Sequence, residues 1–68
     1  MMMLPSEDDE VELLADLKEI YGLSKGDKGK VLLRYDKVNE DDEYDFEVFF
    51  ENIDMSVILL ESQIKLVE

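Results

Sequence analysis

The spacing of apolar side chains in the second half of this chain restricts its fold more than any other feature. In residues 30–36 and again in residues 44–51, every second side chain is large and apolar, and most of the side chains between them are charged. Period two is the period of a β-strand that packs one face on a core. The polar residues 37–43 are long enough for a hairpin connection. The sequence therefore predicts two antiparallel strands.

Two shorter segments continue this pattern. Residues 55–60 are rich in β-branched and large apolar side chains, and residues 64–67 are apolar again after one tight turn. We expect one antiparallel, strongly twisted sheet with strands at 29–36, 44–51, 55–60 and 64–67.

Residues 6–21 fit two structures on local grounds. A helix is favoured by Ser6 as an N-cap, by acidic residues in the first turn and by Gly22 just beyond the last turn. A strand is favoured by the alternation of apolar and acidic residues between Val11 and Leu17. Intrinsic propensity favours the helix. Local sequence alone leaves both structures open.

The stretch from Gly22 to Val31 reads G-L-S-K-G-D-K-G-K-V and resembles the G-L-x-K-G-D-x-G-x-V phrase that opens many small SH3-like barrels. It is similar especially to a family of short bacterial proteins without an established activity, in which a Y-E-V-E-F strand and a closing x-x-Q-L-x-x-L follow. The corresponding residues here are Tyr44–Phe50 and Ser62–Leu66. The chain departs from the family at Lys18, where the family has proline.

The resemblance implies a mainly β fold, a small five-stranded SH3-like barrel with residues 11–17 as its first strand. Gly26 and Gly29 would then supply the positive φ values of the turn before the second strand. The alternative is an α+β fold in which a helix at about residues 7–21 packs on a four-stranded antiparallel sheet. We expect residues 1–10 to form a flexible acidic arm and residues 11–68 a single domain. The expected interior of the barrel consists of Val11, Leu13, Leu17, Val31, Leu33, Tyr35, Phe46, Val48, Val57, Leu59, Ile64 and Leu66.

The absence of two residue types excludes most catalytic chemistry. The 68 residues include no His and no Cys, so the chain has no imidazole base, no thiolate nucleophile and no His or Cys ligand for a transition metal. Its serines lie in no nucleophile motif. The acidic run that begins at Asn39 lacks the Gly and Glu of a calcium loop. We therefore expect neither an enzyme nor a cofactor or metal site.

The N-terminus lacks the positively charged region of a signal peptide, and no apolar run approaches the length of a membrane span. We expect a cytoplasmic protein that does not contact membranes.

Negative charge is large and unevenly distributed. The net charge is −12, which divides into −6 for residues 1–24, +3 for residues 25–37 and −9 for residues 38–68. We expect the central basic block to neutralise acidic neighbours within the fold, and its acidic flanks argue against direct contact with nucleic acid. The hairpin acids are the candidate partner-binding site: Glu40, Asp41, Asp42, Glu43, Asp45 and Glu47.

A second candidate site consists of apolar residues that alternation assigns to the solvent-facing side of the strands. These are Leu14, Leu32, Phe49 and either Ile58 or Leu60. Other residues already suffice to fill one small barrel, so this set needs a cover. The cover is the N-terminal segment, an apolar partner or a second copy of the chain.

Two functions follow from these surfaces. In the first, the protein is a small acidic inhibitor or regulator, of the kind made by phages and mobile elements or of the immunity type. It would occupy a basic surface of a larger protein, with carboxylates in the place of nucleic-acid phosphates. In the second, it is a structural or assembly subunit that docks through an apolar sheet face. The charge exceeds the magnitude of about 2–8 that solubility requires and therefore favours the inhibitor.

Overall fold

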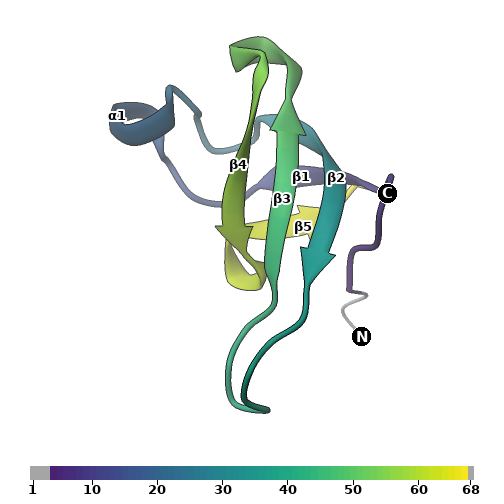
Figure 1. Cartoon of the computed structure of the whole chain (residues 1–68). Helices are drawn as coiled ribbons and strands as arrows, with labels where there is room; N and C mark the ends of the chain where they lie inside the picture. Colours follow the sequence, from purple (N-terminus) through teal and green to yellow (C-terminus); the bar gives the residue numbers. More distant parts are fainter. Residues whose placement is uncertain (1–3, 68) are drawn as a thin grey trace.

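Residues 4–67 are described by the computed structural model, in which they form a small antiparallel β-structure with little helix (Figure 1). The strands are β1 (Glu10–Leu13), β2 (Lys28–Tyr35), β3 (Asp45–Phe50), β4 (Met55–Leu60) and β5 (Ile64–Leu66). Single turns of helix lie in the connections: α1 (Lys18–Tyr21), η1 (Glu51–Ile53) and η2 (Glu61–Gln63).

All five strands belong to one antiparallel sheet in the order β4-β3-β2-β1-β5. Strands β1 to β4 therefore follow one another as a meander, and β5 returns beside β1. This arrangement confirms the mainly β, five-stranded fold that the sequence predicts, and it is consistent with a small barrel. The barrel is not closed, because within residues 4–67 the edge strands β4 and β5 pair with β3 and β1 and not with each other.

The first strand is shorter than the sequence predicts, and a helix over residues 7–21 is wrong. Strand β1 ends at Leu13, and α1 is a single turn. Long-range pairing overrides helix propensity here, because Val11 pairs with Gly29 on one side and with Leu66 on the other. A helix at this position would leave β2 and β5 without the strand that joins them.

The residues between β1 and β2 form a loop that folds back on itself. Leu17 forms a bridge with Leu23, whose side chain is fully buried. The Leu13 N–H donates to the Asp27 carbonyl oxygen at 2.8 Å, which joins the two ends of the loop. Gly22 ends α1 in the left-handed conformation, with φ of 75°. In Figure 1 the loop and α1 extend away from the barrel.

The core is a single cluster of apolar side chains from all five strands and the α1 loop. It contains Val11, Leu13, Leu23, Val31, Phe46, Val48, Phe50, Val57, Leu59 and Ile64. Leu17 and Leu66, which were predicted to be interior, are half-buried against this cluster. Leu23 and Phe50 are buried although they are absent from the predicted interior.

The predicted interior positions of Leu33 and Tyr35 are wrong, because β2 contains a bulge. Val31 pairs with Val48, but the next pair is Leu33 with Glu47, so β2 has one residue more than β3 at this point. An extra residue moves every later side chain of the strand to the opposite face. Leu33 and Tyr35 consequently face outward and are 38% and 40% exposed.

The segment before β1 runs beside β2. Pro5 is buried and Leu4 packs against the core. The Asp8 N–H donates to the Val31 carbonyl oxygen at 2.8 Å, and the Val31 N–H donates to the Asp9 carbonyl oxygen at 2.9 Å. Antiparallel hydrogen bonding to β2 therefore continues into the residues that precede β1.

Gly29 is required for space and not for a positive φ, contrary to the sequence-based expectation. It lies in strand β2, where an added Cβ would be 2.7 Å from Val48 Cγ1 and 2.8 Å from the Phe49 carbonyl oxygen. The glycines with positive φ are Gly22 and Gly26, at 75° and 97°.

We expect Gly29→Ala to lower the free energy of unfolding by about 2–3 kcal/mol, because the new methyl group overlaps a backbone atom that moves only if β3 moves. Gly22→Ala should cost only about 1–2 kcal/mol, the strain of a left-handed L-residue, since its Cβ would meet nothing closer than 3.8 Å. Urea unfolding of the two variants measures the difference. Equal losses, or a larger loss for Gly22→Ala, would contradict the close contact at Gly29.

Candidate functional site

Strands β2, β3 and β4 present one sheet face to the core and the other to solvent, and we refer to the second as the outer face. Because directly paired residues share a face, the strand register identifies its members. They are Lys30, Leu33 and Tyr35 of β2, Asp45, Glu47 and Phe49 of β3, and Ser56, Ile58 and Leu60 of β4.

Large apolar side chains dominate the outer face. Exposure ranges from 38% for Leu33 to 50% for Ile58, with Tyr35 and Leu60 between them, and Phe49 is half-buried. Leu32, in the bulge, is also exposed. An apolar surface gathered on one face of so small a protein is typical of an interaction site.

The Glu47 carboxylate lies in the middle of the outer face and is held by hydrogen bonds from both neighbouring strands. Tyr35 donates its phenolic O–H to Glu47 Oε1 at 3.0 Å, and Ser56 donates its O–H to Glu47 Oε2 at 2.9 Å. Both carboxylate oxygens thus have a fixed direction. The same hydrogen bond raises the pKa of the Tyr35 phenol above its usual value of 10.0, with smaller contributions from desolvation and from the negative charge of Glu47.

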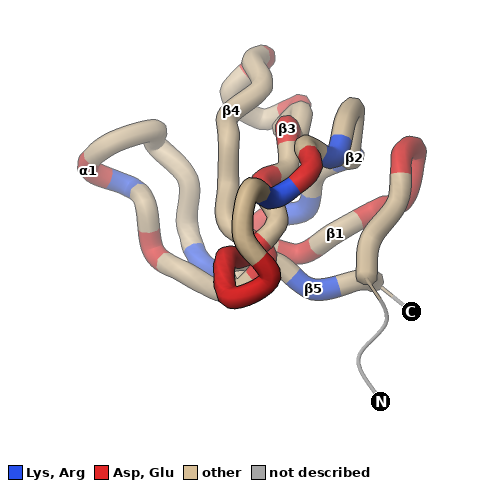
Figure 2. The backbone as a smooth tube through the Cα atoms, turned by 60° about the horizontal axis from the view of Figure 1, so that its bottom comes forward, with Lys and Arg blue, Asp and Glu red and all other residues tan. Residues whose placement is uncertain are grey.

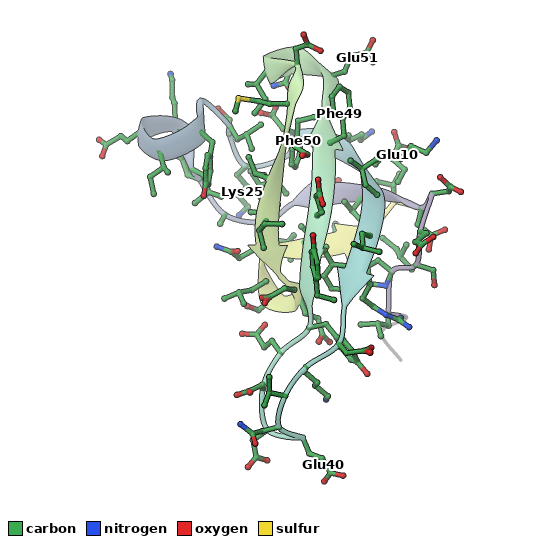
Figure 3. All side chains as sticks on the ribbon, in the orientation of Figure 1. Glu10, Lys25, Glu40, Phe49, Phe50 and Glu51 are labelled. Atoms are coloured by element: carbon green, nitrogen blue, oxygen red, sulfur yellow. The ribbon has the colours of Figure 1, made fainter. Side chains whose placement is uncertain are left out.

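The connection between β2 and β3, residues 36–44, is here called the acidic loop. It projects from the end of the barrel opposite η1, with Glu40 at its tip and Glu51 at the far end of the molecule (Figure 3). A turn closes the tip, where the Asp42 N–H donates to the Asn39 carbonyl oxygen at 3.1 Å. Figure 2 shows the run of acidic residues on this projecting loop.

The six predicted acidic site residues divide into three groups. Glu40, Asp41 and Asp42 are exposed at the tip of the acidic loop. Glu43 instead has a structural contact, because its Oε1 accepts a hydrogen bond of 2.7 Å from the Ser62 N–H at η2. The remaining two, Asp45 and Glu47, lie on the outer face.

Cationic side chains at the base of the acidic loop stack on one aromatic ring. Arg34 and Lys37 lie over the Tyr44 ring, at 5.2 Å and 4.9 Å from its centroid. The Lys37 ammonium also donates to the Glu40 carbonyl oxygen at 3.2 Å. These contacts hold the base of the loop against the sheet.

The acidic loop and the outer face meet without a gap. Asp45 and Leu60 are paired across β3 and β4, and both line a shallow hollow together with residues 36–38 and 41–43 of the loop. The two candidate surfaces in the sequence are therefore parts of one continuous surface, with mainly apolar side chains around Glu47 on the sheet and an acidic margin on the loop.

The predicted apolar residues are only partly brought together. Leu32 and Phe49 lie at the outer face, as do both Ile58 and Leu60. Leu14 lies at the other side of the sheet order, where its N–H donates to the Gln63 carbonyl oxygen next to β5. Sequence reasoning missed Leu33 and Tyr35, although the adjacent Leu32 and Leu33 already break strict alternation and are a signal of a bulge.

The basic block contributes little charge pairing to the fold. Within residues 4–67 the single ion pair joins Lys30 Nζ to Asp8 Oδ1 at 3.6 Å, with both side chains mostly exposed. Exposed pairs of this kind contribute about 0–1 kcal/mol to stability. In the same residues no group of three or more acidic side chains is placed to hold a metal ion, and no helix is long and apolar enough to cross a membrane.

Comparisons with models of protein families, with curated proteins and with solved structures gave no match to this chain.

The hydrogen bond between Tyr35 and Glu47 predicts a pH dependence of stability. Since the fold raises the phenol's pKa, this contribution is fully present below the pH at which an unfolded tyrosine ionises. It is lost as the pH rises through the raised pKa of Tyr35. Alkaline titration followed by tyrosinate absorbance should show one phenol that ionises late.

Substitution identifies that phenol. Tyr35→Phe should remove the late component, whereas Glu47→Gln should return the pKa of Tyr35 toward its ordinary value. A late component that persists in Tyr35→Phe would assign the raised pKa to another tyrosine.

Proposed function

We propose that this protein is a small non-enzymatic inhibitor or regulator that binds a basic surface of a larger protein, in the manner of an acidic nucleic-acid mimic or an immunity protein. The observation that carries the proposal is the continuity between the outer face and the acidic loop at Asp45 and Leu60. Protein interfaces commonly combine an apolar centre with a polar rim. This surface has that composition, and its rim is acidic.

The charge of the rim indicates the charge of the partner. Glu40, Asp41 and Asp42 project into solvent on a loop that leaves the body of the barrel. With a net charge of −12, the whole protein would attract a basic partner from a distance and repel acidic ones. Such steering accelerates association and gives specificity, which suits a protein that must occupy a nucleic-acid-binding or otherwise cationic surface.

The centre of the surface would supply affinity that does not depend on salt. Leu33, Tyr35, Ile58 and Leu60 are exposed together, and their removal from water on binding is favourable by roughly 25 cal/mol per Å² of apolar area. The Glu47 carboxylate would meet a cationic side chain of the partner. Two hydrogen bonds already fix its orientation for that contact. A rigid acceptor loses little conformational freedom on binding.

The second candidate function is a structural or assembly subunit that docks permanently through the outer face. The exposure of Ile58 and Leu60 on β4 favours it. Salt dependence separates the two functions, because an acidic inhibitor loses affinity as salt rises whereas an apolar dock does not.

We expect the variant Glu40→Gln, Asp41→Asn, Asp42→Asn to bind a basic partner more than tenfold more weakly at low salt, which corresponds to about 1.4 kcal/mol. Its free energy of unfolding should stay level or rise, because like charges on the loop no longer repel one another. The partner is first captured from the native host at low salt and identified by mass, and the purified pair is then titrated at two salt concentrations.

A matched control removes three charges elsewhere. Glu7, Glu19 and Glu51 are exposed residues outside the acidic loop and the outer face, so their joint change to Gln should weaken binding far less. Equal losses in the two triple variants would reduce the acidic loop to a contributor of net charge and would contradict its role as a site. Glu43 is left unchanged, because its contact with Ser62 supports η2.

The apolar centre is tested by Leu33→Gln with Ile58→Gln. We expect this variant to bind more than tenfold more weakly at both salt concentrations, because the lost apolar burial is not screened by salt. Unchanged affinity, together with a strong effect of the loop variant, would confine the interface to the acidic loop.

A further inference from the structure

Strand β4 forms an edge of the sheet, and half of its backbone groups point away from the protein. Its one sheet neighbour among residues 4–67 is β3. The Glu61 N–H donates to the Tyr44 carbonyl oxygen, and hydrogen-bonded pairs alternate along an antiparallel ladder. Val57 and Leu59 therefore face β3 with their N–H and C=O groups. The corresponding groups of Ser56 and Ile58 point outward from the edge.

The two ends of this open edge are bounded. At the η2 end, Gln63 Oε1 accepts a hydrogen bond of 2.8 Å from the Leu60 N–H, which is the next outward-pointing donor. At the other end, the α1 loop approaches η1, because a Cβ on Gly22 would lie 3.8 Å from Ile53 Cγ2. The open part of the edge is therefore short and centred on Ser56 and Ile58.

Strand β4 lacks the features that normally protect an edge. It reads Met-Ser-Val-Ile-Leu-Leu, without charge, proline or bulge. The other edge, β5, is a three-residue strand with a lysine at its centre. Proteins usually blunt edge strands with charges, proline or shortness, and an uncharged edge readily pairs with another chain. The open edge of β4 is thus suited to accept a further strand.

Charge around the open edge indicates which strand it accepts. Asp54 and Glu61 flank β4 at its two ends, and Asp45 and Glu47 lie on the adjacent strand β3. A strand paired with β4 would extend the row that contains Glu47 and Ile58. Lysine or arginine on the outer face of that strand would therefore extend past Ile58 toward these carboxylates, while the residues between them would lie on the opposite face of the sheet.

A second copy of this chain fits the edge poorly. In an antiparallel pairing of two β4 strands, Asp54 of one copy would approach Glu61 of the other. Each copy also carries a net charge of −12, so association would be opposed by long-range repulsion. Charge complementarity favours a basic partner over self-association.

We propose that the edge of β4 binds an extended basic segment of the partner protein, which adds to the sheet as a sixth strand through the backbone of Ser56 and Ile58. This inference rests on the proposed function, since it names the part of the basic partner that is recognised. Backbone hydrogen bonds to a sheet edge supply affinity, and alternate side chains supply specificity.

The first experiment uses a short synthetic peptide in which arginine and valine alternate, with the intact protein. The peptide should bind, and it should slow amide hydrogen exchange at Ser56 and Ile58. In the free protein these amides should exchange quickly, whereas those of Val57 and Leu59 should be protected by β3. A peptide in which glutamate replaces arginine should not bind. Absence of binding by the arginine peptide, or protection confined to the acidic loop, would overturn the proposal.

The second experiment removes an edge donor. Ser56→Pro deletes the outward N–H at a position where an edge strand tolerates proline, and Ser56→Ala is the matched control that loses the same hydroxyl. We expect the peptide and the natural partner to bind Ser56→Pro at least tenfold more weakly than Ser56→Ala. Equal affinities would overturn the edge proposal. If Ser56→Pro does not fold, the edge proposal is tested by amide hydrogen exchange of the unmodified protein with and without the peptide.

These results separate the two proposals. A basic partner whose binding is salt-dependent but insensitive to Ser56→Pro would leave the inhibitor function standing and remove the edge from it. Failure to bind any basic protein would remove the proposed function itself. Sedimentation of the protein alone tests self-association. A dimer that dissociates in the Ser56→Pro variant would assign the edge to a second copy of the chain and overturn the proposal.

Discussion

Between Val31 and Leu33, strand β2 contains one residue more than the strand opposite, and this bulge changes the face on which the later side chains of β2 lie. Before the bulge, Val31 points into the core. After it, Leu33 and Tyr35 point to solvent and form the outer face with β3 and β4. A chain of this size has only one interior, so side chains that the bulge turns outward are available for binding.

The same strand must also pass close to its neighbours at Gly29. There β2 pairs with β1 and lies against Val48 and Phe50 of β3, at distances that leave no room for a Cβ. This close approach lets β2 lie between β1 and β3 and contact both. Packing at Gly29 and the bulge after Val31 thus have complementary effects on β2. The first packs the start of the strand against the core, and the second turns the side chains at its end toward solvent.

Charge and apolar surface have separate places on this protein. The acidic tip extends from the barrel on a loop whose base is held by cations over Tyr44, which keeps three neighbouring carboxylates away from the core. The sheet carries the apolar side chains and one fixed carboxylate, Glu47. In the proposed function, the loop would attract the basic partner at long range and the sheet would contact it at short range. The edge of β4 lies next to both parts.

The sequence correctly predicted the β class, the four later strands to within about one residue, and the exposure of the acidic loop, because period-two alternation and turn residues are local properties of the chain. It did not determine the length of β1, where helix propensity competes with pairing partners that are distant in sequence. It placed Gly29 in a turn, whereas only the packing of β3 reveals the missing space. Alternation also failed at Leu33 and Tyr35, since a bulge depends on the register of the opposite strand. Alternation did assign Phe49 and either Ile58 or Leu60 to the outer face. The tertiary structure added Leu33 and Tyr35 to it, placed Glu47 between Tyr35 and Ser56, and left the edge of β4 open, because each of these features requires side chains or backbone from separate strands.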